Sequence, residues 1–371
     1  MMVLTIRKER RELCNLVRYS AWHQVAFGNK VVSGTSRKLK GMSTFPPPED
    51  PSYNHRFAYV NGVRLHYIDV GPRDALPIVL VHGFPDLWWG WRFQIQALRQ
   101  SYRVIVADNR GYGSSDVPTA IEAYSRKNVC KDYAELLDLL GINRAVFIGH
   151  DWGGDVVWKM CSFYPDQVLA VATVCTPYTP RSPQLYSLEL IVSKLPNFRY
   201  QLLFANESAA GHLDEHAHSF FNALFGNLPN GFEHADVATI VENVTKFKFD
   251  RPLPSIMTQA DFDYYLAKYR GTTFRGPLNW YRTRDIDWTD LAGKSVVIPH
   301  EALFIAADQD VALPPAMSKG MEKFVPNLTR KLVKGADHWV LFEKPDLVNA
   351  TLLEWLAPIA AKAQQFLRSA L

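Results

Sequence analysis

The segment at residues 149–154, with the sequence GHDWGG, places a carboxylate between small residues. The apolar run at 145–148 predicts a buried strand before it, and the apolar positions of 156–160 predict a helix after it. A strand, a sharp turn and a helix form a nucleophile elbow, which holds the central side chain clear at the carboxyl edge of a sheet. Glycines flank the turn because a Cβ there would collide with a neighbouring strand or helix. The central residue is Asp151, and a carboxylate nucleophile attacks a carbon that bears a leaving group, such as an epoxide or alkyl halide carbon, to form an ester that water must cleave.

A histidine late in the chain is the expected base. His338 lies in a glycine-containing loop after a strand predicted over 328–333. Asp308 and Asp310 both follow the strand predicted over 302–306, so either carboxylate qualifies as the acid that orients the imidazole. We expect Asp310, because a residue further past the strand end reaches the carboxyl edge more easily. It would hold His338 in the tautomer that accepts a proton from water.

A second loop is expected to complete the site as an oxyanion hole. The sequence HGFP at 82–85 follows an apolar strand predicted over 77–81. The backbone N–H groups of Phe84 and Trp152 are expected to point at the ester carbonyl oxygen of Asp151 as it becomes an oxyanion. The histidine of this loop is expected to be structural, and its proline to lie in a cis or tightly turned peptide.

The elements that must position these groups alternate between strand and helix on both sides of a long insertion. Asn61-Gly62 between two apolar runs predicts a β-hairpin with a type I′ turn. An amphipathic helix is expected over 124–140 and another helix near 315–324. Between 178 and 288 the pattern is helical and rich in aromatics, with no convincing parallel strand. The fold class is therefore α/β, an α/β-hydrolase fold with a mostly parallel sheet flanked by helices and an inserted helical cap. The expected domains are a disordered basic extension at 1–45, a first core part at 46–177, a helical cap at 178–294 and a second core part at 295–371.

Composition excludes several classes of protein. The chain has 371 residues, 47% of them hydrophobic, which allows a large core. Nine of the 41 basic residues but two of the 37 acidic ones lie in residues 1–40, so the remainder carries a net charge of −3. Such a mildly acidic body does not suggest a nucleic-acid partner. The four cysteines are sparse and are expected to be free thiols in a reducing compartment.

Targeting signals are weak. No run of about 18 apolar residues predicts a transmembrane segment, and the start lacks the apolar region of a secretory signal. The protein is expected to be cytoplasmic, although the basic start also fits an organelle transit peptide or a start codon upstream of a functional Met42. The carboxyl end at 369–371, SAL, resembles a peroxisomal address without its basic middle residue.

The motifs together resemble the soluble epoxide hydrolases of the α/β-hydrolase fold over about residues 53–360. Those enzymes carry HGFP and an aspartate nucleophile followed by Trp, as in HGFP at 82–85 and GHDWGG at 149–154. They also place two cap tyrosines over the nucleophile to protonate the epoxide oxygen. The segments YQLLF at 200–204 and LNWYR at 278–282 resemble those motifs, which implies that Tyr200 and Tyr281 are the two donors. The acid and the base of the family fall on Asp310 and His338.

The resemblance implies an epoxide hydrolase that converts a lipophilic epoxide to a vicinal diol. The expected partners are this small molecule and water, in a monomer or a homodimer, with no nucleic acid. No cofactor or metal is expected, because no HExxH frame accompanies the histidines at 212–218. The expected substrate-binding residues are Phe84, Pro85, Trp152, Tyr200, Tyr281 and Trp339.

Two alternatives stay open. A haloalkane or haloacid dehalogenase shares the fold, the Asp nucleophile and the histidine. Haloalkane dehalogenases, however, resemble one another in the motif HGNP, where this chain has HGFP. Fluoroacetate dehalogenases place arginines just after the nucleophile, where this chain has Trp152 and Asp155. A hydrolase-fold binding module without activity would not need the complete set of groups.

Overall fold

The fold is built on one eight-stranded sheet in the order β1-β2-β4-β3-β5-β6-β7-β8. The pairs β1–β2 and β2–β4 are antiparallel, and every later pair is parallel. The central strands are buried along nearly their whole length, as their uninterrupted apolar sequences predict. The strands are β1 (His55–Val60), β2 (Val63–Val70), β3 (Pro77–Val81), β4 (Arg103–Ala107), β5 (Ala145–His150), β6 (Val168–Val174), β7 (Glu301–Ala307) and β8 (Leu328–Val333).

The computed structural model describes residues 45–226, 235–247 and 256–369. Residues 47–371 form one unit by their internal contacts, and the features below belong to it. The expected basic extension at 1–45 lies, except for Phe45, outside the described residues, as do the last two residues of the carboxyl end.

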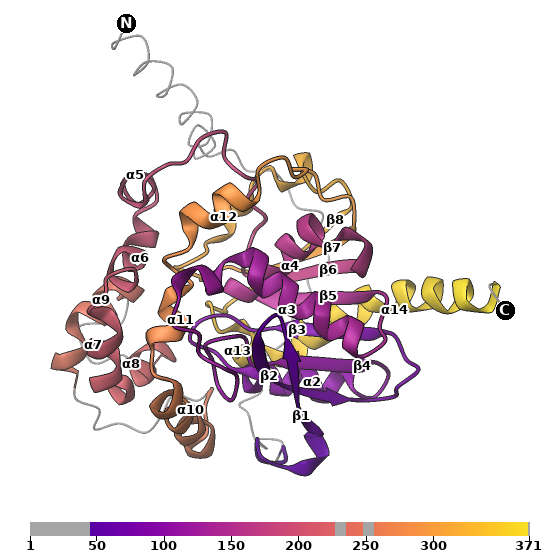
Figure 1. The fold of residues 1–371 in the computed structure, drawn as a ribbon, viewed down its shortest axis with the longest axis horizontal. Coiled ribbons are helices and arrows are strands. Elements are labelled where there is room, and N and C mark those ends of the chain that lie inside the picture. The colour runs from indigo at the N-terminus through magenta and orange to yellow at the C-terminus, as the bar shows by residue number, and fades with distance from the viewer. Residues whose placement is uncertain (1–44, 227–234, 248–255, 370–371) are drawn as a thin grey trace, which may run out of the picture. The chain divides into compact units, whose positions relative to one another are not determined.

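Helices cover both faces of the sheet. On one face α3 (Arg126–Leu139) packs against α4 (Trp152–Phe163), and on the other α2 (Arg92–Leu98) packs against the closing helix α14 (Pro345–Ser369). Figure 1 shows α3 and α4 in front of the strands and α14 passing behind them. The predicted amphipathic helix is confirmed as α3, whose buried side includes Tyr133, Leu136 and Leu137. This arrangement leaves the carboxyl ends of the parallel strands free to carry the site.

A helical insertion lies between β6 and β7, as the sequence predicts. Among the described residues of 178–294 there is no strand. Its helices lie together on one side of the sheet in Figure 1, which is consistent with a cap. They are α5 (Leu188–Lys194), α6 (Arg199–Phe204), α7 (Ala209–Glu215), α8 (Ala217–Leu224), α9 (Val237–Asn243), α10 (Gln259–Thr272), α11 (Arg275–Asn279) and α12 (Arg284–Asp290).

The prediction of one continuous helix near 315–324 is wrong. Two short 3-10 helices, Pro315–Ser318 and Met321–Lys323, take its place. Gly320 separates them in the left-handed conformation, with φ of 83°. A residue at positive φ cannot continue a right-handed helix, so the segment breaks there. Another short 3-10 helix precedes α2, at Trp88–Trp91, and α13 (Val340–Glu343) precedes α14.

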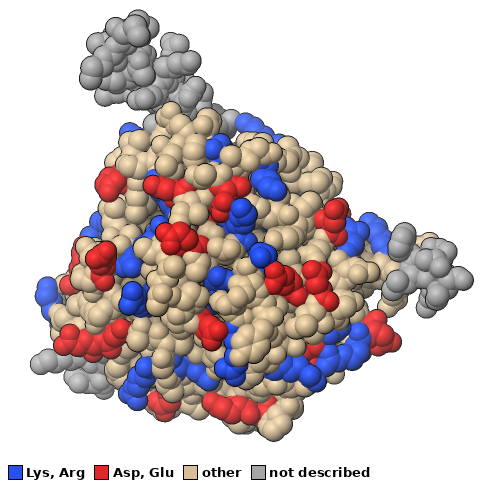
Figure 2. Space-filling model, viewed as in Figure 1, with Lys and Arg blue, Asp and Glu red and all other residues tan. Residues whose placement is uncertain are grey.

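The surface and the cysteines add little chemistry. Figure 2 shows basic and acidic side chains interspersed on the face in view. Within the part of the chain that the structure describes, no helix combines the length and hydropathy that a membrane span requires. Cys130, Cys161 and Cys175 are free and buried, in agreement with the predicted thiols.

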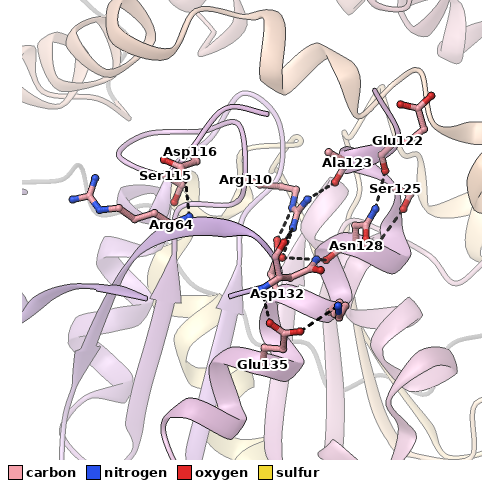
Figure 3. Close-up of polar contacts among 12 residues, drawn as sticks. Arg64, Arg110, Ser115, Asp116, Glu122, Ala123, Ser125, Asn128, Asp132 and Glu135 are labelled. Carbon is pink, nitrogen blue, oxygen red and sulfur yellow. Dashed lines mark hydrogen bonds and ion pairs between the residues drawn. The ribbon is translucent and has the colours of Figure 1, made fainter. Parts of the chain in front are cut away.

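A buried ion pair fastens the first hairpin to α3. Asn61 and Gly62 both have positive φ, of 46° and 76°, as a type I′ turn requires. The Asn61 side chain donates from Nδ2 to an Asp132 carboxylate oxygen at 3.0 Å. Arg110, from the loop after β4, donates from Nε to the same carboxylate at 2.7 Å and from Nη2 to its other oxygen. Figure 3 shows Arg110 and Asp132 facing each other at the amino-terminal half of α3.

Replacing Asp132 by alanine should destabilise the fold strongly. The side chains of Arg110 and Asp132 are 3% and 2% exposed, so the substitution leaves a buried guanidinium without its counter-charge, at a cost of about 3–5 kcal/mol. The urea midpoint of Asp132→Ala measures this. The control is Lys131→Ala, which removes the exposed Lys131–Glu135 pair of the same helix and should cost less than about 1 kcal/mol. Equal midpoints for the two variants would contradict the assigned importance of the buried pair.

Candidate active site

The predicted elbow is present at the end of β5. Asp151 adopts φ of 53° and ψ of −127° between β5 and α4. A non-glycine residue in such a conformation costs on the order of 1–3 kcal/mol and persists only when its surroundings enforce it. The surroundings here are tight: a Cβ on Gly149 would lie 2.2 Å from the Gly153 oxygen, and a Cβ on Gly153 would lie 2.0 Å from the Val81 oxygen. Only glycine fits, so helix α4 starts directly against β3 and β5 and the Asp151 side chain projects from the turn.

The Asp151 carboxylate has a different neighbour at each oxygen. The Phe84 backbone N–H donates to Oδ1 at 2.7 Å. The loop approaches this closely because Gly83 has no side chain: a Cβ there would lie 2.3 Å from Oδ1. The other oxygen, Oδ2, lies 3.5 Å from Nε2 of His338. The structure therefore places the Phe84 N–H beside the carboxylate, where the sequence led us to expect it, and the Phe84–Pro85 peptide is cis.

His338 and Asp310 lie together, as expected from their strand ends. Nδ1 of His338 is 2.8 Å from Oδ2 of Asp310. The other Asp310 oxygen accepts the backbone N–H groups of Ala312 and Leu313, at 2.9 and 2.8 Å. Asp308 does not reach the imidazole and instead accepts the Gly335 N–H at 2.8 Å. The geometry thus selects Asp310 over Asp308 as the carboxylate that orients His338.

The charges of this group are coupled. Burial works against the Asp310 charge, but the neighbouring His338 and the hydrogen bond from Leu313 outweigh it and hold the Asp310 pKa at about 2. Burial also disfavours a charged imidazole, yet the two carboxylates of Asp310 and Asp151 raise the His338 pKa well above its usual value. The pKa of Asp151 is lowered, because His338 outweighs its desolvation. With a free Asp151 carboxylate, His338 is therefore an imidazolium between two anions.

The two tyrosines predicted from the cap both lie at the site. Tyr200 comes from α6 and Tyr281 follows α11, and their ring centroids are 6.1 Å apart. Tyr281 also contacts the rings of Trp152 at 5.1 Å and Phe84 at 5.4 Å, so it sits over the elbow and the HGFP loop. Burial and then the Asp151 charge raise the pKa of both phenols. Both are therefore neutral hydroxyl donors at ordinary pH.

Aromatic rings pack against the two tyrosines. Phe204 lies 5.0 Å from Phe84 and 5.0 Å from Tyr281, ring centroid to centroid. Trp339, next to the predicted base, is buried, and its indole N–H donates to the Leu224 carbonyl of the cap at 2.7 Å. The surroundings of the predicted reacting groups are accordingly apolar.

His82 and Trp152, which the sequence analysis singled out, lie next to the site. His82 is fully buried, and its Nε2 accepts the Asn109 N–H at 3.0 Å, which confirms its predicted structural place. Trp152 begins α4 beside Asp151, but its N–H as a second oxyanion donor stays a prediction.

Sequence reasoning missed two buried polar groups. Asp86 directly follows HGFP and accepts a hydrogen bond from the Tyr265 hydroxyl, and burial raises the Asp86 pKa to about 7. His150 donates from Nε2 to the His338 carbonyl at 2.8 Å, and burial lowers the His150 pKa to about 4, so it is neutral. Their positions in the sequence could have revealed both residues. Asp86 directly follows HGFP, and His150 directly precedes Asp151 within GHDWGG.

One group of metal-ligating side chains occurs in the described part of the chain. The ligand atoms of His150, Cys175 and His338 lie within 4.8 Å of one another. The two nitrogens of His338 already face Asp310 and Asp151. The cluster is therefore accounted for by hydrogen bonding around the imidazole.

Comparison with known proteins shows the family of the chain. The family of the alpha/beta hydrolase fold matches residues 77–345. Epoxide hydrolase A of Mycobacterium tuberculosis is 37% identical over 313 residues, which cover 81% of this chain and 96% of that protein. This chain belongs to the epoxide hydrolases of the α/β-hydrolase fold.

Some relatives are longer than this chain. Bifunctional epoxide hydrolase 2 of Mus musculus is 39% identical over 320 residues, which cover 84% of this chain but 57% of that protein. The chain thus spans less than two thirds of the length of this mammalian relative. Among solved structures, epoxide hydrolase A from Mycobacterium thermoresistibile has a TM-score of 0.73 and 35% identity, covering 81% of this chain and 97% of that one.

Removing the Asp151 charge should lower the pKa of His338. That charge is one of the two that raise it, so in Asp151→Asn the imidazole should lose its proton at lower pH than in the wild type. The measurement is an NMR titration of the His338 ring. Tyr281→Phe is the control, because it changes no charge and should leave the His338 titration in place. An unchanged midpoint in Asp151→Asn would contradict the coupling of the two groups.

Proposed function

We propose that the protein hydrolyses a lipophilic epoxide to a vicinal diol through a covalent ester on Asp151. The observation that carries this proposal is one carboxylate that lies beside a histidine–aspartate pair and whose charge acts on two buried, neutral tyrosines of the cap. The names of the relatives support the same reaction class. The division into a core at 46–177 and 295–371 and a cap at 178–294 is part of the proposal, because the two tyrosines belong to the cap.

In the first step Asp151 attacks an epoxide carbon. Oδ1 is held by the Phe84 N–H, which leaves Oδ2 as the attacking oxygen. A bond forms between Oδ2 and the carbon while the carbon–oxygen bond of the ring breaks. The ring oxygen takes a proton from Tyr200 or Tyr281, whose raised pKa values keep that proton available. The product is a hydroxyalkyl ester.

In the second step water cleaves the ester. Esterification removes the Asp151 charge, so the His338 pKa falls and the imidazolium gives up its proton, which returns to the tyrosinate left by ring opening. The neutral imidazole can then act as a base. It takes a proton from water as the water oxygen attacks the ester carbonyl carbon, and Asp310 stabilises the imidazolium. The negative charge that forms on Oδ1 is met by the Phe84 N–H and, as we propose, by that of Trp152. In the collapse the bond between the carbonyl carbon and the substrate oxygen breaks, and the remaining proton of the attacking water passes to the departing alkoxide. This releases the diol and restores the carboxylate beside the imidazolium.

The substrate class follows from the walls of the site. Buried rings of Phe84, Phe204 and Phe220 lie within 6.3 Å of one another by their centroids. Apolar walls of this kind favour apolar groups of a substrate, whereas the two hydroxyls and one carboxylate would recognise the epoxide itself. We therefore propose an epoxide with an aromatic or long alkyl substituent.

Diol formation tests the proposal directly. Styrene oxide, a fused cyclic epoxide and a long-chain fatty epoxide would be incubated with the wild type and with Asp151→Asn. We expect diol from at least one of them and a loss of at least about 10⁴-fold in the variant, as for removal of a nucleophile. Bromoalkanes, assayed in parallel for halide, are the control. Halide without diol would assign the protein to the dehalogenases instead.

Tyr281→Phe should separate the two steps. The phenol donates its proton only while the ring opens, so its loss should slow ester formation by about 10²-fold or more and ester cleavage much less. Rapid-quench single turnovers, with the ester trapped by acid, give both rate constants. Tyr264→Phe is a matched control, because its hydroxyl accepts from the Trp88 indole away from the elbow. Equal losses in both steps for Tyr281→Phe would contradict the donor role.

A further inference from the structure

A buried arginine stands behind the elbow, outside the groups that the reaction uses. Arg126 begins α3 and is 2% exposed. Its guanidinium carbon lies 4.1 Å from the centroid of the Trp152 ring and 5.0 Å from that of Trp280. Trp152 directly follows the nucleophile and Trp280 directly precedes the second cap tyrosine. One cation is thus stacked on a residue of the core and on a residue of the cap.

The hydrogen bonds of the guanidinium divide in the same way. On the core side Nε donates to Asp155 Oδ2 of α4 at 3.0 Å. On the cap side Nη2 donates to the Trp280 carbonyl at 3.1 Å and Nη1 to Thr283 Oγ1 at 3.4 Å. A planar guanidinium presents donors in several fixed directions, so this one side chain holds α4 and the segment after α11 in one geometry.

Arg126 is connected to Tyr281 through two intermediate groups. The Trp152 ring, on which the guanidinium stacks, makes an edge contact with the Tyr281 ring at 5.1 Å and 75°. The Trp280 carbonyl, which accepts from Nη2, belongs to the peptide unit that joins Trp280 to Tyr281. Both the ring and the backbone of this tyrosine are therefore braced by Arg126.

The charges around Arg126 support a fixed position. Asp155 lies 3.0 Å from Nε and also faces Lys159 at 3.5 Å, and Asp287 of the cap lies 3.9 Å from Nη1. The Asp287 carboxylate also accepts the Arg126 backbone N–H at 2.6 Å. Asp155 of the core and Asp287 of the cap therefore compensate the charge of the buried arginine on both sides. Lys159 continues this alternation of charges on α4.

We propose that Arg126 is a positioning residue for ester formation, which holds Tyr281 of the cap in register with Asp151 of the core. The inference rests on the proposed epoxide reaction and goes beyond it, because it assigns a role to a residue that touches neither substrate nor reacting atoms. A proton donor displaced by about 1 Å can cost about 10²-fold in rate. Ester cleavage uses His338 and water, so it should depend much less on this brace.

The test compares Arg126→Lys with Arg110→Lys. Each substitution keeps the charge of a buried arginine and loses its planar guanidinium. The Arg110 side chain, however, donates its hydrogen bonds to core groups, among them Asp132 and the Ala123 carbonyl. Single turnovers with an epoxide from the diol panel would give both rate constants. We expect Arg126→Lys to slow ester formation by about tenfold and ester cleavage by less than about threefold. Arg110→Lys should change neither by more than about twofold, whatever it does to the urea midpoint.

A double-mutant cycle adds a readout that loss of stability would not reproduce. In a Tyr281→Phe background the Arg126→Lys substitution should slow ester formation by less than about twofold more, because the group that it positions is already missing. A full additional tenfold loss, or equal losses in both steps for Arg126→Lys alone, would overturn the proposal. So would equal effects of the two lysine variants. Absence of any ester in the wild type would instead count against the proposed reaction itself.

Discussion

The backbone of Asp151 is the constraint on which the rest of the site depends. Its positive φ is unfavourable for a residue with a side chain and is held there by packing that tolerates no Cβ at Gly149 or Gly153. The Asp151 carbonyl is also fixed, because the Thr176 hydroxyl donates to it at 2.7 Å. This turn places the carboxylate at the sheet edge, where the Phe84 N–H and the His338 ring approach it from different strands. Any relaxation of the turn would separate the carboxylate from both.

Electrostatics then links the groups that the turn brings together. An imidazole between two buried carboxylates is held protonated, and each carboxylate is held ionised by the imidazolium. Conversion of one carboxylate to an ester would release the imidazole from that state without any movement of the chain. The proposed cycle therefore changes the role of His338 through charge alone, from a counter-ion of the nucleophile to a base. The uncharged His150 next to it preserves this balance, because burial keeps it neutral.

In the proposed reaction the cap contributes the remaining chemistry through rings and hydroxyls. Tyr200 and Tyr281 belong to segments far from Asp151 in the sequence, so their placement depends on how the cap contacts the core. Those contacts combine aromatic packing around Phe84 with polar fastening: the Trp339 indole binds the Leu224 carbonyl, and the Trp280 indole binds the Arg110 carbonyl at 3.3 Å. The buried cation of Arg126 belongs to the same interface. Polar groups at such a junction fix direction, whereas apolar packing alone would allow the rings to slide.

Local patterns in the sequence determined the strands, the hairpin turn, the elbow and the identity of the proposed nucleophile, because each depends on residues adjacent along the chain. Neighbouring glycines were enough to predict the left-handed turn at Asn61-Gly62. They were also enough to predict the elbow at Asp151. The choice between Asp308 and Asp310 could be argued only from distance past the strand, and the structure made it by hydrogen bonds. The break at Gly320 was missed because a glycine within a helical pattern does not reveal its φ. The Asp86–Tyr265 pair and the Arg126 brace depend on side chains separated by more than a hundred residues, such as Arg126 and Trp280. Burial and the approach of distant segments set their charges and partners, so only the tertiary structure decided them.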